Sequence, residues 1–265
     1  MEFGLSEEQL LMRDALTRYL VEACPVVRLR EVAAGNRALT SQLKSGLSEL
    51  GLSQVVVPAD YGGLGLGVLD ACVIQMALGH AAAPVPFLAR SVLAVQALNA
   101  SDNAELKERW LPSVGTGEAN FSIAINELGG SRENAGVTAQ NGRLTGKSLF
   151  VLELEGASHV IVAARDATLH VVDLHDATIT TTPLTTIDKT RLTHELVFEE
   201  TPAVELCSAA DGGVTAHQLL RTARVLLSAD TIGAADEMLR QAVEYAGQRQ
   251  QFGRIIASYQ AVKHM

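Results

Sequence analysis

Three residues near the end of the chain have side chains that could hold a phosphate beside a flat ring system. Arg249, Gln251 and Phe252 lie between Gly247 and Gly253, so a cation, an amide and an aromatic ring stand together where the backbone can bend. A guanidinium fork binds phosphate oxygens in pairs, and it also stacks on flat rings. A plainer interpretation stays open on residue types alone, because cations are common at helix C-termini and Phe252 could belong to a core.

A long helix is expected to position these residues. Small and apolar residues recur every three or four positions before them, as on one face of a helix. A helix over 214–246 would be roughly 45–50 Å long, which suits one member of a helical bundle. The predicted stripe comprises Leu220, Ala223, Leu227, Thr231, Ala234, Met238, Ala242 and Tyr245.

The beginning of the chain shows helix signals only. Ser6 is placed to cap a helix, with Gln9 closing a capping box, and an apolar face then continues to Pro25. Further helices are expected over 41–50, 68–79, 86–98 and 106–112. The three glycines of 63–67 do not have the GxGxxG spacing of a dinucleotide-binding loop, so that segment is interpreted as a turn.

Strand signals follow. Residues 121–126 alternate between apolar and polar, and Asn141-Gly142 is a typical hairpin turn. Strands are expected over 121–126, 137–147, 159–165, 168–174, 178–182 and 194–198, as in a small β-barrel or sandwich. The predicted fold class is α+β, with a helical domain over 1–119, a β domain over 120–208 and the start of a helical bundle over 209–265.

Composition excludes several function classes. The chain has 265 residues, 21 basic against 30 acidic side chains and a net charge of −9, which disfavours nucleic-acid binding. Its three cysteines have no metal-ligand or paired spacing. No apolar run reaches the ~18 residues of a membrane span, and no signal peptide is evident, so a cytoplasmic protein is expected.

The run from Tyr245 to His264 resembles the signature of the acyl-CoA dehydrogenase family. The resemblance implies that FAD is the cofactor and that this segment reaches FAD held by a neighbouring subunit. The residues that it places on the cofactor are Arg249, Gln251, Phe252, Tyr259 and Gln260.

Two earlier segments resemble the family's flavin loops. Residues 124–131 are similar to the loop that follows the first strand, which places Ile125, Asn126 and Ser131 beside the flavin and Ser131 also beside the substrate. Residues 146–152 are similar to the next flavin segment, which implies contacts from Phe150, Val151 and Leu152. Two departures are evident: Leu128 replaces a proline, and Leu152 replaces a hydroxyl residue and cannot donate a hydrogen bond.

The catalytic base is missing from the expected place. Removal of a proton next to a thioester carbonyl needs a carboxylate within hydrogen-bond reach. Counting back from Arg249, the family's position for that glutamate on the long helix is Ala223, and the following Arg224 matches an arginine near the substrate. The family's other location for the base lies beyond Met265, and Asp230 is the nearest further carboxylate on the helix.

The resemblance implies a subunit that oxidises an acyl-CoA thioester to its 2,3-enoyl product. The short, departing flavin loop resembles that of actinobacterial heteromeric subunits acting on bulky, steroid-derived acyl chains. The partners implied are homo- or hetero-oligomers and an acceptor such as an electron-transfer flavoprotein. The alternative is a non-catalytic partner subunit that supplies part of the flavin site. Because the family continues with further helices, the chain is expected to be a C-terminally truncated form.

Overall fold

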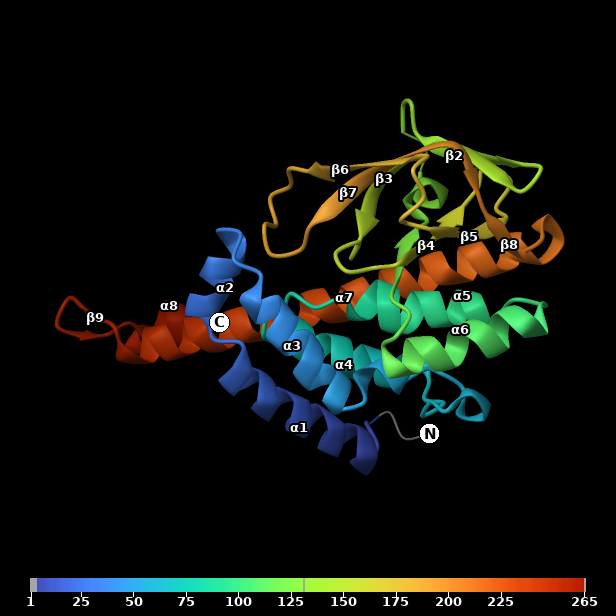
Figure 1. Ribbon diagram of the computed structural model, residues 1–265. Coiled ribbons are helices and arrows are strands. Elements are labelled where there is room, and N and C mark those ends of the chain that lie inside the picture. Colours follow the sequence, from blue (N-terminus) through green and yellow to red (C-terminus); the bar gives the residue numbers. More distant parts are fainter. Residues whose placement is uncertain (1–3, 131, 265) are drawn as a thin grey trace.

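The computed structural model describes residues 4–130 and 132–264. Helices up to residue 116 precede a β-sheet, and one long helix follows the sheet (Figure 1). This order confirms the predicted fold class. The first elements are α1 (Glu7–Ala23), α2 (Val26–Ala33), α3 (Ala38–Glu49), η1 (Leu52–Gln54), η2 (Ala59–Tyr61), α4 (Val68–His80), η3 (Phe87–Leu93), α5 (Ala94–Asn99) and α6 (Ala104–Thr116).

Local sequence signals account for several helix boundaries. The predicted capping box is present, because the Ser6 hydroxyl accepts from the Gln9 amide at 3.2 Å and the Gln9 side chain accepts from the Ser6 amide at 3.0 Å. Pro25 does end the first helical face, but it also directly precedes α2, which was not predicted. A proline suits a helix start, where no hydrogen bond from its nitrogen is needed.

Two predicted helices differ from expectation in their form. The segment expected as one helix over 86–98 divides into α5 and a π-helical stretch, η3. A π-helix of this kind is rare and is found mostly near functional sites. Helix α6 begins at Ala104 and continues past Pro112 to Thr116, so Pro112 does not end it as expected.

The sheet is mixed and has eight strands in the order β6-β7-β3-β1-β4-β5-β8, with β2 paired to β3. β1 and β4 are parallel, whereas the other described pairs are antiparallel. The predicted hairpin turn is present, with Asn141 and Gly142 at φ values of 52° and 72°. The strands are β1 (Phe121–Ala124), β2 (Gly136–Gln140), β3 (Arg143–Leu152), β4 (His159–Ala163), β5 (Leu169–Asp173), β6 (Ile179–Leu184), β7 (Thr193–Pro202) and β8 (Val204–Cys207), of which β8 was not predicted.

Alternate residues of the central strands enter two different cores. Ile123 and Ile161 pack into the large core that the helices form. Their neighbours Ala124, Val160 and Val162 point the other way, into a second core made within the sheet. The period-two geometry of strands therefore places one sheet face on the helices and leaves the other to close on itself.

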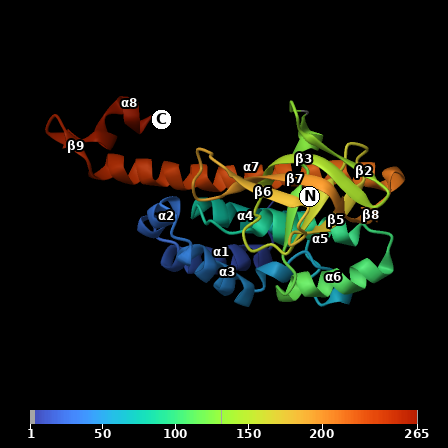
Figure 2. The ribbon, with the colours of Figure 1, turned by 45° about the horizontal axis from the view of Figure 1, so that its top comes forward.

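The long helix α7 (Ala209–Gln248) lies against α4 along its first part and then extends beyond the other helices (Figure 2). Its buried positions include Ala216, Leu219, Ala223 and Leu226. The predicted stripe coincides with this buried face at Ala223, and its members Leu220 and Ala234 are partly buried. Its later members Leu227, Met238 and Tyr245 are 44%, 64% and 61% exposed. No described helix is both long and apolar enough to cross a membrane.

Candidate functional site

The turn that follows β1 is fastened to the end of β3 by two neighbouring side chains. Asn126 lies in the short helical turn η4 (Asn126–Gly129), and its amide donates to the Phe150 carbonyl at 2.5 Å and more weakly to the Leu149 carbonyl at 3.4 Å. Glu127 accepts from the Ser148 hydroxyl at 2.8 Å and from the Leu149 amide at 2.7 Å. Glu127 was not predicted to take part in the site, because its hydrogen-bond partners lie more than 20 residues away along the chain.

These contacts hold Phe150 in an uncommon conformation. Its φ of 55° lies in the left-handed region, which a bulky residue rarely adopts, and the pairing of β3 with β7 is irregular between Ser148 and Val151. The bend leaves the Phe150 ring 38% exposed, with the Arg132 guanidinium 5.2 Å from its centroid. The Phe150 ring is exposed and its backbone is fixed in a strained conformation. A flat ligand could stack on such a ring.

The other predicted residues of this segment offer less to a ligand. Val151 is fully buried in the sheet core, and Ile125 is buried in the helical core. Leu152 packs partly against the helical core. Through their side chains these residues would shape the site rather than donate hydrogen bonds. Ser131 lies outside the described residues.

The same turn lies beside α7. A Cβ added at Gly129 would be 3.7 Å from the Leu220 side chain and 3.9 Å from a terminal nitrogen of Arg224. The structure therefore places Arg224 beside η4, the turn that contains Asn126. The strand-end group is defined here as Ile125, Asn126, Phe150, Val151 and Leu152. The arginine predicted to lie near a substrate and the loops predicted to lie near a flavin are neighbours in space.

Neither position of α7 considered for the base supplies a free carboxylate. Ala223 is 8% exposed and packs in the helical core. Asp230 accepts two hydrogen bonds from Arg191, at 2.9 and 3.0 Å, and one from Gln75 at 2.7 Å. These contacts make Asp230 a structural tie between α4, α7 and the segment before β7.

The residues after α7 form a small projecting hairpin. Its strands are β9 (Gln250–Gln251) and β10 (Arg254–Ile255), and they are joined at Phe252 and Gly253, which both have positive φ values. The turn η5 (Ile256–Ser258) and helix α8 (Gln260–Lys263) follow. The Tyr259 hydroxyl donates to the Gln251 carbonyl at 2.9 Å, and the Arg254 guanidinium lies 3.8 Å from the Tyr259 ring centroid.

Several side chains of the hairpin that were predicted to contact the flavin are exposed to solvent. Phe252 is 95% exposed, and the side chains of Arg249, Gln251 and Gln260 are also exposed. Within the described part of the chain the Arg249 guanidinium has no hydrogen-bond or ion-pair partner. A free guanidinium, an amide and an aromatic ring fit a phosphate-bearing flavin, whereas the strand-end group supplies a wall and few free donors.

One chain does not bring these two groups together. Arg224 and Arg249 are 25 residues apart on one continuous helix, which corresponds to roughly 37 Å. The hairpin lies at the far end of α7 from the sheet in both views (Figure 1, Figure 2). That gap exceeds the reach of the side chains, so contact of both groups with one ligand requires a second chain.

Comparison with known proteins identifies the family. Residues 6–118 match the N-terminal domain of acyl-CoA dehydrogenases, and residues 210–265 match their C-terminal domain. The chain is 29% identical over 262 residues to the acyl-CoA dehydrogenase IpdE2 of Mycobacterium tuberculosis, covering 97% of this chain and 70% of that protein.

Two solved structures share the fold. The ChsE4-ChsE5 complex from Mycobacterium tuberculosis has a chain 27% identical to this one, with a TM-score of 0.87 over all of this chain and 73% of its own. A variant of the steroid ACAD Tcur3481-Tcur3483 is 28% identical, with a TM-score of 0.83 over 97% of this chain and 72% of its own. The chain belongs to the acyl-CoA dehydrogenase family, whose members are oxidoreductases.

Proposed function

We propose that this chain is a subunit of an FAD-dependent acyl-CoA dehydrogenase whose flavin site is completed by a second chain. The observation that supports this most is the unpaired Arg249 on a hairpin that projects beyond the rest of the fold. Bound FAD would accept the hydride that leaves the β carbon of the acyl chain. The product would be the 2,3-enoyl thioester.

Each group of residues has a distinct part in this proposal. Arg249 and Gln251 bind the pyrophosphate of FAD held by the neighbouring subunit, and Phe252, Tyr259 and Gln260 line the same cofactor. The strand-end group borders the ring of the flavin held beside its own sheet, with the exposed Phe150 as its wall. Arg224 orients the substrate beside that ring.

The base that removes the α proton comes from outside the described residues, because Ala223 has no carboxylate and Asp230 is held by Arg191.

A second candidate function is favoured by this missing base and by Leu152, whose side chain cannot donate a hydrogen bond to the flavin. The chain would then be a non-catalytic partner that completes the flavin site of an active subunit.

The solved relatives support the finer assignments. One is described as a complex of two proteins, and another as a steroid ACAD. We infer that this chain works in a heteromeric cytoplasmic assembly on a bulky, steroid-derived acyl-CoA. Its electrons pass to an acceptor such as an electron-transfer flavoprotein.

Visible spectra under anaerobic conditions test the function and separate its two forms. The chain is loaded with FAD, alone and together with its partner subunit, and an acyl-CoA is added. We expect no bleaching of the flavin by the chain alone and bleaching by the complex. Rapid bleaching by the isolated chain would show that this chain itself contains the catalytic base. Replacement of the partner's base by glutamine should abolish bleaching if this chain is the non-catalytic member.

A further inference from the structure

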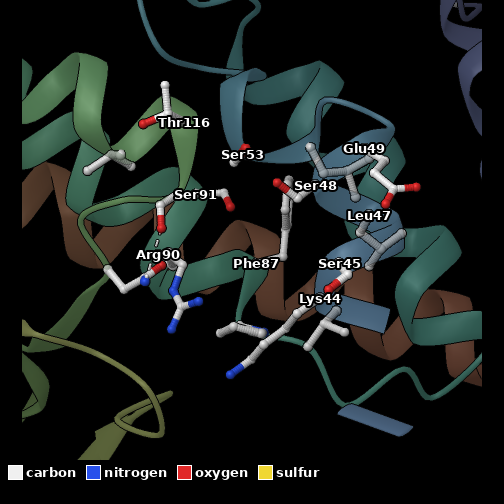
Figure 3. A pocket seen from close by; sticks show the side chains of 16 residues that line it. Lys44, Ser45, Leu47, Ser48, Glu49, Ser53, Phe87, Arg90, Ser91 and Thr116 are labelled. Carbon is white, nitrogen blue, oxygen red and sulfur yellow. Dashed lines mark hydrogen bonds between the residues drawn. The ribbon is translucent and has the colours of Figure 1, made fainter. Parts of the chain in front are cut away.

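A cavity of about 430 Å³ lies between α3 and η3. Figure 3 shows Phe87 standing in its middle, with Lys44 and Arg90 together on one side and the serines 45, 48, 53 and 91 around it. The volume falls within the ~300–1,000 Å³ typical of small-molecule sites. None of the residues lining this cavity belongs to the strand-end group or to the hairpin.

The two cations face the cavity without a direct carboxylate partner. Among the described residues, Lys44 donates only to the Glu155 carbonyl at 3.1 Å, and a terminal nitrogen of Arg90 reaches the same carbonyl at 3.4 Å. Burial lowers the pKa of Lys44 and the neighbouring Arg90 charge lowers it further, whereas the Glu155 and Glu153 carboxylates raise it. Two like charges held this close are stabilised by an anion placed between them.

Unused polar atoms point to the same place. The Nε atom of Arg90 is buried and has no hydrogen-bond partner in the described part of the chain. The hydroxyl of Thr40, which is 8% exposed, also has none there, and it lines a small cavity that shares Lys44, Val85 and Pro86 with the first. Buried polar atoms normally find partners, so these two leave hydrogen-bonding capacity unused in the wall beside the cavity.

We propose that this cavity binds a small organic monocarboxylate, with its carboxylate between Lys44 and Arg90 and its apolar body against Phe87. A carboxylate matches the planar fork of an arginine. A more highly charged phosphate is disfavoured, because the Glu49 carboxylate lines the same cavity. The remaining wall, including Leu47, Leu52 and Val114, suits an apolar or aromatic body.

Ligand-observed NMR on the purified chain tests the proposal without any flavin or activity. The probe is phenylacetate, with the neutral phenylacetamide and inorganic phosphate as comparisons. Lys44→Met and Arg90→Gln should each weaken phenylacetate binding by about tenfold or more, since each removes a charge-assisted contact. Lys189→Met, which removes an exposed lysine elsewhere, should leave binding unchanged.

Circular dichroism shows whether the variants fold. If Lys44→Met and Arg90→Gln do not fold, Ser48→Trp narrows the cavity from an exposed position and keeps both cations; it should abolish binding. The proposal is overturned if phenylacetamide binds as well as phenylacetate, if phosphate displaces the probe at equal concentration, or if the folded variants bind like the wild type. Absence of binding to the folded wild-type chain also overturns it.

Discussion

At the scale of single residues, Glu153 is the group whose surroundings change its chemistry most. It follows directly after β3 with a φ of 56°, and its carboxylate accepts from the Ala89 amide at 2.8 Å and from the Arg90 amide at 3.4 Å. Burial raises its pKa to about 7, although the two amides, Arg191 and Arg90 lower it. Glu153 therefore links the sheet to the start of the π-helical stretch, and its carboxylate binds a proton at a higher pH than an ordinary glutamate does.

This shift predicts a pH dependence of stability. Between the ordinary pKa of 4.5 and about 7, the folded chain keeps a proton that the unfolded chain releases. The free energy of unfolding should therefore fall as pH rises through this window, by on the order of 3 kcal/mol. Glu153→Gln, which cannot titrate, should remove that part of the slope.

Urea unfolding at several pH values across the window measures it. Glu155→Gln, a change of the exposed glutamate two residues further on, is the matched control and should keep the wild-type slope. Equal slopes for the wild type and Glu153→Gln would show that the proton is not held at Glu153.

The sequence predicted short-range features of single residues and missed long-range ones. The capping of Ser6 by Gln9 and the turn at Asn141-Gly142 depend on neighbours within a few residues, so local patterns were sufficient. Glu127 finds its partners across 21 and 22 residues, and Asp230 meets Arg191 across 39. Such pairs depend on how the elements pack, which residue types and spacing do not specify.

At the scale of elements, two glycines allow α4 and α7 to approach closely. A Cβ at Gly79 would lie 2.1 Å from the Asp230 carbonyl oxygen, and one at Gly233 would lie 2.0 Å from the Met76 carbonyl oxygen. Neither backbone atom can move aside without separating the helices. The stripe predicted for α7 does not include Gly233, because a glycine adds no apolar side chain to a helical pattern.

Gly79→Ala should therefore lower the free energy of unfolding by about 1–3 kcal/mol, as overpacking usually does. Gly247→Ala, at the exposed end of α7 where an added Cβ meets nothing within 4 Å, is the matched control. It should be neutral or stabilising by up to ~1 kcal/mol through helix propensity. Chemical denaturation of both variants checks this, and a Gly79→Ala chain as stable as the wild type would mean that the helices are farther apart.

The hairpin after α7 is the element on which flavin binding depends in the proposed function. Arg249→Glu should lose FAD from the assembled complex, because it replaces a charge-assisted contact with repulsion. The helical signal should not change, since the Arg249 side chain supports no other described residue. Lys189→Glu makes the same charge change on an exposed loop and should keep FAD. Unchanged FAD content in the Arg249→Glu complex would leave Arg249 as a helix-end cation only.

At the scale of the whole molecule, the second half of α7 leaves apolar side chains uncovered by any described element. Ile232, Leu239 and Val243, which lie on one face of the helix, are 56%, 65% and 64% exposed. Exposed apolar patches of this kind usually mark interfaces between proteins. The same half of α7 ends in the hairpin, so a chain that covers the patch would also lie beside Arg249.

The flavin should therefore sediment only with an oligomer. In analytical ultracentrifugation followed at the visible absorbance of FAD, the coloured species should be heavier than the 28.1 kDa single chain. Dilution should release FAD and chains together, because neither the strand-end group nor the hairpin completes the site without the other. Leu239→Lys, which adds a charge to the exposed patch and leaves both groups untouched, should shift the sedimentation towards a colourless monomer. A yellow species of single-chain mass would contradict the two-chain site, and it would require both groups to contact one flavin across the roughly 37 Å of helix that separate them.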